Sequence, residues 1–479
     1  MKFNKWTMGL AALGAVSLAS VAKAEEKMSF VQTATSGTTI SGYVDTSVEW
    51  AVNPNHSTFN SGLNGLSGPY NGFAPMSPSG IPFRANKQNG FNLNVVELNI
   101  SKPLDETPWA SGYNVSLLFG PDAVGYNPSA NGAGGQFVGG TSADFAIKDA
   151  NVVLRAPIGN GLEIKIGVFD TIIGYEVFEA GSNPNFTRSW GYAIEPTQHT
   201  GLLFTYHVND DISVSAGIAN TLSPGINSRN TSGGGTANYW EKTALASITL
   251  TAPQSWGWAA VATFSAGMVY GFDAGVSDDR LNVYAGITIP TPIKGLAFGA
   301  AFDYTQFDHK YSEVSGFDNN SGCCCCGYSY VPSQAGMGSG TYENNFYSGK
   351  QSVEAYSFAL YATWQATEKL SFNLRGEYVH ASSTDKGFSD TDYYVNCSYD
   401  GATEFYYDDH VNADIFAVTG TLQYNLWANV ISRLEVRYDT VCYRTSSTGF
   451  DFRTDEFSHS SNSGSKDQLS LYLNIIYKF

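Results

Sequence analysis

Short segments in which apolar and polar residues alternate recur along almost the whole chain. In the first of them, 39–52, Val44 and Val48 alternate with Asp45 and Glu49. Successive side chains of a β-strand point to opposite sides, so this alternation predicts a strand with one apolar and one polar face. The segments interpreted as strands are 39–52, 91–102, 111–119, 145–156, 162–169, 197–208, 211–219, 242–251, 257–270, 279–289, 294–306, 351–364, 369–381, 412–425, 428–439 and 468–479. The sequence therefore predicts an all-β protein with about sixteen strands.

The connections between these segments alternate between short and long. The short ones lie near 103–110, 157–161, 209–210, 252–256, 290–293, 365–368 and 426–427. The long ones are rich in Gly, Ser and Asn and lie at about 53–90, 120–144, 170–196, 220–241, 307–350, 382–411 and 440–467, with only 271–278 shorter. Outer-membrane barrels have short periplasmic turns and longer external loops, whereas a sandwich or a repeat array has no reason to alternate so strictly. We therefore expect a single transmembrane antiparallel β-barrel.

The two faces of the predicted strands differ in chemistry. In "LEIKIGVF" (162–169) the apolar residues share one side, and Glu163 and Lys165 share the other. The stretch 428–440 likewise sets Val, Leu and Tyr residues against Arg, Glu and Asp residues. A face with this many charges does not suit lipid, so we expect the apolar face to meet the membrane and the polar face to line water. Barrels of about 16–18 strands enclose an aqueous channel.

The first 24 residues read as a secretory signal peptide. Lys2 and Lys5 precede an apolar run that ends at the small residues Ala22 and Ala24, the form of a cleavage site. The predicted mature chain is therefore 25–479, the barrel. It contains no run of 18 apolar residues, so no transmembrane helix is predicted, but a barrel strand needs only about 9–11 residues.

The net charge argues against a nucleic-acid partner. Without the three lysines of the signal peptide, 23 basic residues remain against 43 acidic ones, a formal charge of about −20. Proteins that neutralise phosphates need clustered Lys and Arg. The acidic balance instead suggests a preference for cations.

The chain ends in the alternating segment "QLSLYLNIIYKF" (468–479), with Tyr477 and Phe479 on its apolar side. Aromatic side chains are stable at membrane interfaces, and Trp109, Trp256, Trp258, Trp364 and Trp427 also lie at or beside the short connections. This ending resembles the C-terminal signal by which the assembly machinery recognises outer-membrane barrels. We therefore predict export to the outer membrane of a Gram-negative bacterium, with membrane lipid and the assembly machinery as partners.

Four stretches carry a resemblance to a known family. "GYVDTSVEW" (42–50), "FNLNVVELNISKP" (91–103), "KIGVFDTIIGYEVFE" (165–179) and "HTGLLFTY" (199–206) resemble the OmpL-like β-barrel porin family of Gram-negative outer membranes. The resemblance implies passive diffusion of ions and small hydrophilic solutes through a water-filled barrel. It supplies neither a substrate nor binding residues. Trimers are typical of 16-stranded porins, but no subunit interface can be read from these residues.

In porins, the third long connection commonly folds into the lumen and narrows it, and here that connection is 170–196. We expect opposed charges at this constriction, because rows of charge set pore selectivity. The candidate residues are Asp170, Glu176, Glu179 and Glu195 on the acidic side and Arg155, Lys165, Arg375, Arg433 and Arg437 on the basic side. The alternative is that 170–196 is an external loop and the cations pair only with neighbouring lumen acids.

Six cysteines occur, and four of them are adjacent in "SGCCCCGYSY" (321–330). Zinc sites usually use pairs of Cys separated by two to four residues, so four adjacent thiols do not favour a metal. An exported chain passes through an oxidising compartment, which favours disulfides between long loops. The candidates are Cys323, Cys324, Cys325, Cys326, Cys397 and Cys442, and the pairing stays open. We expect no metal and no cofactor.

Three other classes of protein were weighed against a porin. An enzyme within a barrel has no sequence support, since neither G-x-S-x-G nor H-E-x-x-H occurs, although a triad could assemble from distant positions. A transporter with an N-terminal plug does not fit, because alternation begins close behind the signal peptide. A surface adhesin or structural barrel is the stronger alternative, given the long connections 307–350 and 382–411.

Overall fold

The computed structural model describes residues 37–52, 90–105, 107–126, 145–222, 224–228, 240–273, 278–316, 344–390, 404–451 and 456–479. The predicted signal peptide, 1–24, lies outside these residues. Among the described residues, no helix is long and apolar enough to cross a membrane.

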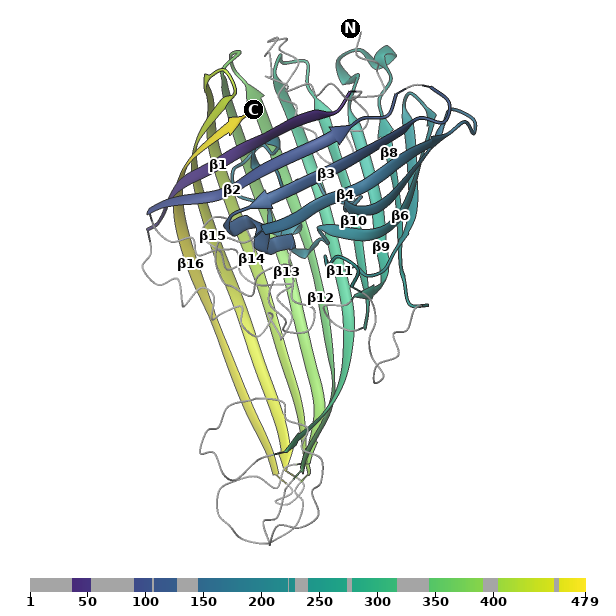
Figure 1. Ribbon diagram of the computed structural model, residues 1–479. Helices are drawn as coiled ribbons and strands as arrows, with labels where there is room; N and C mark the ends of the chain where they lie inside the picture. The colour runs from purple at the N-terminus through teal and green to yellow at the C-terminus, as the bar shows by residue number, and fades with distance from the viewer. Residues whose placement is uncertain are drawn as a thin grey trace.

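Sixteen antiparallel strands close into one barrel, in which β1 pairs with both β2 and β16 (Figure 1). The strands are β1 (Thr39–Ala51), β2 (Gly90–Lys102), β3 (Ser111–Phe119), β4 (Phe145–Ala156), β5 (Leu162–Asp170), β6 (Gln198–Asn209), β7 (Ile212–Ala219), β8 (Thr243–Thr251), β9 (Thr263–Asp273), β10 (Asp278–Pro290), β11 (Leu296–Gly316), β12 (Asn344–Gln365), β13 (Leu370–Asp390), β14 (Glu404–Trp427), β15 (Val430–Asp451) and β16 (Glu456–Lys478). The short helices are η3 (Pro121–Tyr126), η4 (Ala180–Ser182), α3 (Trp190–Ile194) and η5 (Gln254–Ala259). The predicted fold class and strand number are confirmed.

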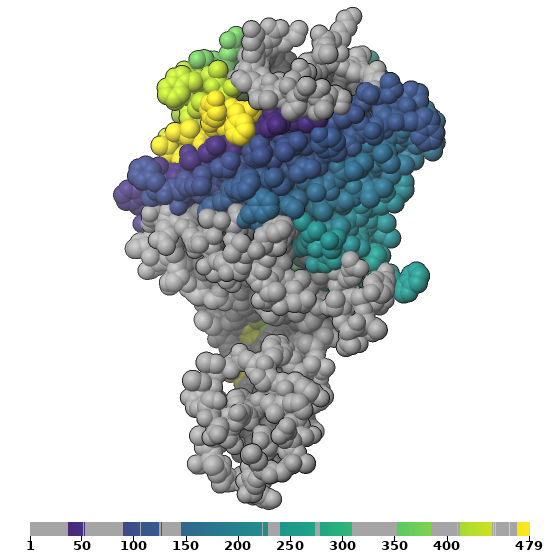
Figure 2. Space-filling model, in the orientation of Figure 1, coloured from purple at the N-terminus to yellow at the C-terminus, as the bar shows by residue number. Residues whose placement is uncertain are grey.

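The two faces of each strand differ as the sequence predicts. On β15, Leu434 and Val436 point outward with 52% and 44% of their surface exposed, whereas Arg433 and Glu435 point inward and are 2% and 0% exposed. Large apolar side chains cover the outside of the other strands as well. Figure 2 shows this outer surface over β1–β4. A chain with this apolar exterior is suited to lipid, because lipid does not penalise exposed apolar groups.

The barrel wall has two parts of unequal height. Strands β1–β10 are 8–13 residues long, whereas β11–β16 have 21–24 residues and extend far beyond the others (Figure 1). The predicted ends of these last strands were wrong, because parts of 307–350, 382–411 and 440–467 continue the ladder instead of forming loops. Polar residues occupy both faces there, as in 382–390, so no alternation marks the strand. The segment predicted to start at 257 begins with η5, and β9 starts at Thr263.

Candidate functional site

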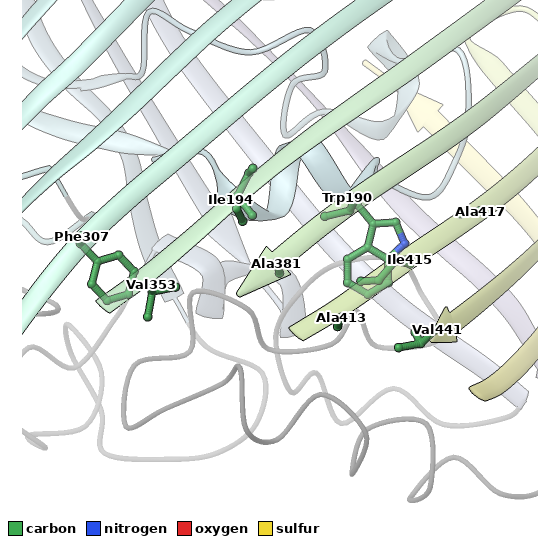
Figure 3. Close-up of a cluster of buried hydrophobic side chains, with 11 residues drawn as sticks. Trp190, Ile194, Phe307, Val353, Ala381, Ala413, Ile415, Ala417 and Val441 are labelled. Carbon is green, nitrogen blue, oxygen red and sulfur yellow. The ribbon is translucent and has the colours of Figure 1, made fainter. Parts of the chain in front are cut away.

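The connection between β5 and β6, residues 171–197, packs against the inner faces of strands all around the barrel. Trp190 and Ile194 of α3 lie among apolar side chains of β11–β15 (Figure 3). Phe178 and Phe186 pack with residues of β1–β4 and β16, and Ile173 packs with residues of β5–β12. We call this connection the lumen loop, since its side chains touch opposite walls.

Three inward arginines bind the main chain of the lumen loop. Arg375 on β13 donates to the carbonyl oxygens of Thr187 at 2.6 Å and Arg188 at 3.0 Å. Arg433 on β15 donates to the carbonyl oxygens of Ala180 at 2.6 Å and Asn183 at 2.8 Å. Arginine suits this role because its five donors are fixed in one planar fork.

Arg437 lies on the same inner face of β15 as Arg433. It donates to the carbonyl oxygen of Arg188 at 2.7 Å. The Arg375 guanidinium also pairs with Glu176 of the loop at 2.8 Å and with Glu377 at 2.6 Å. Arg437 pairs with Asp439 at 2.8 Å. Arg433 also donates to the side-chain oxygen of Gln423 at 2.8 Å, so each of the three guanidinium groups has both a side-chain acceptor and a loop carbonyl.

Carboxylates of the same strands accept hydrogen bonds from the loop. Glu435 accepts from the main-chain N–H groups of Phe186 at 2.6 Å and Thr187 at 2.9 Å. Glu377 accepts from the main-chain N–H of Trp190 at 2.6 Å, and Asp439 accepts from its indole N–H at 2.9 Å. The wall thus binds both the donors and the acceptors of the loop main chain.

We name this set the arginine wall: Arg375, Glu377, Arg433, Glu435, Arg437 and Asp439. It holds three positive and three negative side chains, and each is at most 6% exposed. Charges this deep must be paired and hydrogen-bonded, because an uncompensated buried charge is strongly unfavourable. The arginine wall is therefore built to hold the lumen loop in place.

A second charged cluster connects β4 and the end of β5 with the lumen loop. Lys148 on β4 forms ion pairs with Asp170 at the end of β5, with Glu179 at 2.8 Å and with Asp149 at 3.5 Å. Glu97 on β2 interacts electrostatically with Lys148 and Glu179. We name these residues the Lys148 cluster, in which four carboxyl groups surround one ammonium group.

The sequence analysis missed Lys148 because a β-bulge changes the side-chain alternation there. Ser116 pairs with Asp149 and Leu117 pairs with Ile147, so Lys148 is the extra residue between them. Bulges re-aim side chains, and both Lys148 and Asp149 are buried inside. The adjacent Lys and Asp in an otherwise alternating segment are the only signal that sequence offers.

The structure distributes the predicted site residues over several places. Asp170 and Glu179 contact Lys148, and Glu176 meets Arg375. Arg155 lies apart at the β4–β5 turn, where it donates to the carbonyl oxygen of Asn160 at 3.2 Å. Lys165 lies 6.0 Å from the ring centre of Phe169. The constriction role of these residues stays a prediction.

Two loop carboxyl groups have shifted acidities of opposite sign. Burial alone would raise the pKa of Glu179, but the Lys148 ammonium, hydrogen bonds from Lys148 and the main chain, and the Arg188 guanidinium together lower it. Burial, reinforced by the nearby Asp303 carboxylate, raises the pKa of Glu195 well above its usual range. Within the lumen loop, Glu179 therefore favours the ionised form of its carboxyl group and Glu195 favours the protonated form.

Cysteine and terminal residues are described only in part. Cys442 is exposed and follows the outward alternation of β15, while the other five cysteines lie outside the described residues.

Phe479 exchanges main-chain hydrogen bonds of 2.9 Å with Gly42 of β1, and Tyr477 is exposed on the outer face. Their role as an assembly signal stays a prediction. Within the described part of the chain, no group of His, Cys, Asp or Glu side chains is arranged to hold a metal ion.

A closed barrel with an apolar exterior, a charged interior and a loop folded into its lumen defines an outer-membrane β-barrel of the porin class. The family model described as "Putative beta-barrel porin-2, OmpL-like" matches residues 37–479, and the chain belongs to this family. It is therefore a porin of the Gram-negative outer membrane. The predicted family, general function and location are confirmed. A search of curated proteins found no match.

Several solved structures are similar in fold. OmpT of Vibrio cholerae, in vitro folded and in its trimer form, is 10% identical with a TM-score of 0.46, covering 92% of this chain and 99% of that one. The outer membrane channel DcaP of Acinetobacter baumannii is 12% identical with a TM-score of 0.44, covering 92% and 98%. An anion-selective porin from Comamonas acidovorans is 10% identical with a TM-score of 0.43, covering 92% and 99%. The family assignment rests on the family match alone.

Proposed function

We propose that this porin passes ions and small hydrophilic solutes by passive diffusion, with a preference for cations and with the lumen loop as its constriction. One observation carries the cation preference. The charges of the arginine wall balance one another beneath the loop, whereas the Lys148 cluster holds four carboxyl groups against one ammonium group. The uncompensated charge that a permeating ion meets is therefore negative.

A planar-bilayer recording of the purified protein tests this proposal. We expect stable open channels. In a salt gradient, we expect the reversal potential to have the sign of a cation-selective channel. A clear anion preference would contradict the cation proposal, and a bilayer that stays closed would contradict the channel.

We further propose that the barrel is not an enzyme. We also propose that it assembles as a homotrimer, and chemical crosslinking in detergent would test this assembly.

A surface-exposed structural or adhesin-type barrel is the second candidate. The extension of β11–β16 beyond the other strands favours it, because this part of the wall is far longer than a membrane-spanning strand requires. A closed bilayer together with binding of whole cells to a surface or ligand would support this alternative.

A further inference from the structure

The Lys148 cluster contains more hydrogen-bond acceptors than donors. Within the described residues, Glu97 Oε2, Asp170 Oδ1 and Gln198 Oε1 are buried and meet no donor at hydrogen-bond geometry, although the Tyr43 hydroxyl interacts with the Glu97 carboxyl group. Gln198 lies beside the cluster, since its side-chain amide donates to the carbonyl oxygens of Ile147 and Lys148. The amide oxygen of Gln198 only accepts, and so do the oxygens of Glu97 and Asp170 when these carboxyl groups are ionised. What completes this site is therefore a group that brings donors and positive charge.

The cluster is buried on its wall side and reachable on its loop side. Glu97 and Gln198 are 5% and 1% exposed. The side chains of Asp170 and Glu179 are 41% and 25% exposed. A solute can thus approach through the carboxyl groups of Asp170 and Glu179, with the buried side chains of Glu97 and Gln198 on the wall side.

Lys148 itself shows which chemical group the cluster accommodates. Its primary ammonium group is surrounded by carboxylate oxygens of Asp170, Glu179 and Asp149. An ammonium group carries three donors in a compact positive charge, which matches acceptors spread over several strands better than a planar cation does. A directly ligated metal ion fits less well, since the described residues contain no group of three carboxylates, His or Cys arranged for one.

We propose that the Lys148 cluster is a binding station for solutes that carry a primary ammonium group, and that it makes cationic amines preferred solutes of the channel. This inference rests on the proposed channel function. The ionised state of Glu179, held by Lys148, supplies one of the charges that attract such a solute. Because the station lies at the start of the lumen loop, a bound amine partly obstructs the ion current.

Single-channel recording with 1,4-diaminobutane as the probe tests the station. The full-length protein in planar bilayers should show a saturable decrease of potassium current as the diamine is added, and no decrease with 1,4-butanediol. Asp170→Asn and Glu97→Gln should each raise the half-blocking concentration about tenfold, because each removes one carboxyl group from the cluster. Glu163→Gln is the matched control, since Glu163 also lies on β5 but pairs in register with Arg155 near the turn; it should change the value by less than about twofold.

The outcomes separate this inference from the channel proposal. A wild-type protein that forms no channels contradicts the channel itself. A wild-type protein that conducts ions but shows no saturable block by the diamine contradicts the binding station alone, as does equal block in the wild type and both variants. The two variants lie on different strands, so if one does not fold, the other still decides.

Discussion

The arginine wall and the Lys148 cluster both bind the lumen loop with charged side chains, but their charges are arranged differently. The arginine wall is fully buried, balances three cations with three carboxylates and directs most of its donors at main-chain atoms of the loop. The Lys148 cluster is partly exposed and has carboxyl groups in excess. Balanced, desolvated charges hold a structure in place, whereas unbalanced, accessible ones act on passing ions. The comparison therefore separates the residues that hold the lumen loop from those that we propose to select solutes.

The largest effect is expected from Arg375→Ala. This change removes the donors to two loop carbonyls and leaves Glu176 and Glu377 without their cation. Breaking a buried ion pair by deleting one partner costs about 3–5 kcal/mol. We expect a loss of this size in urea unfolding from lipid vesicles, together with a larger and noisier single-channel conductance. Unchanged unfolding and unchanged conductance would show that the arginine wall does not hold the loop.

Strand number and face chemistry could be predicted from sequence because each leaves a periodic signal, whereas the inward path of 170–196 was expected only from the behaviour of porins. Residues such as Leu434 and Arg433 on β15 fall on opposite faces by simple alternation. Lys148 could not be found this way, because a β-bulge places it inside against the alternation. The loop partners of Arg433 are main-chain oxygens about 250 positions away, and a carbonyl group has no sequence signature. The length of β11–β16 was missed because polar residues occupy both faces at their ends.

A moderate effect is expected from pH at the far end of the loop. Burial and the nearby Asp303 and Glu176 raise the pKa of Glu195, so the folded protein holds this proton more tightly than the unfolded chain does. The contribution to stability is then complete at acidic pH and is lost as the pH rises through the raised pKa of Glu195. We expect unfolding in urea to become easier over that range, and we expect Glu195→Gln to flatten the dependence. An equally steep pH dependence in the variant would assign the effect to other groups.

The smallest effect is expected from Arg155→Ala. Arg155 donates to the carbonyl oxygens of Asn160 in the β4–β5 turn at 3.2 Å and of Asp105 in the β2–β3 connection at 3.5 Å, and it belongs to neither charged set. Exposed polar contacts of this kind contribute about 0–1 kcal/mol. The variant should therefore keep wild-type unfolding and wild-type ion selectivity in a bilayer. A marked shift of the reversal potential would extend the selective region to the turn end of the barrel.

The most direct test of the comparison is the reversal potential of two variants in the same potassium chloride gradient. Asp170→Asn removes one carboxylate from the Lys148 cluster, and Glu435→Gln removes one from the arginine wall. Of these two carboxyl groups only Asp170 has exposed surface, so under the proposed selectivity Asp170→Asn should shift the potential away from cation selectivity while Glu435→Gln leaves it close to the wild-type value. An equal or larger shift with Glu435→Gln would contradict the division between a holding wall and a selecting cluster.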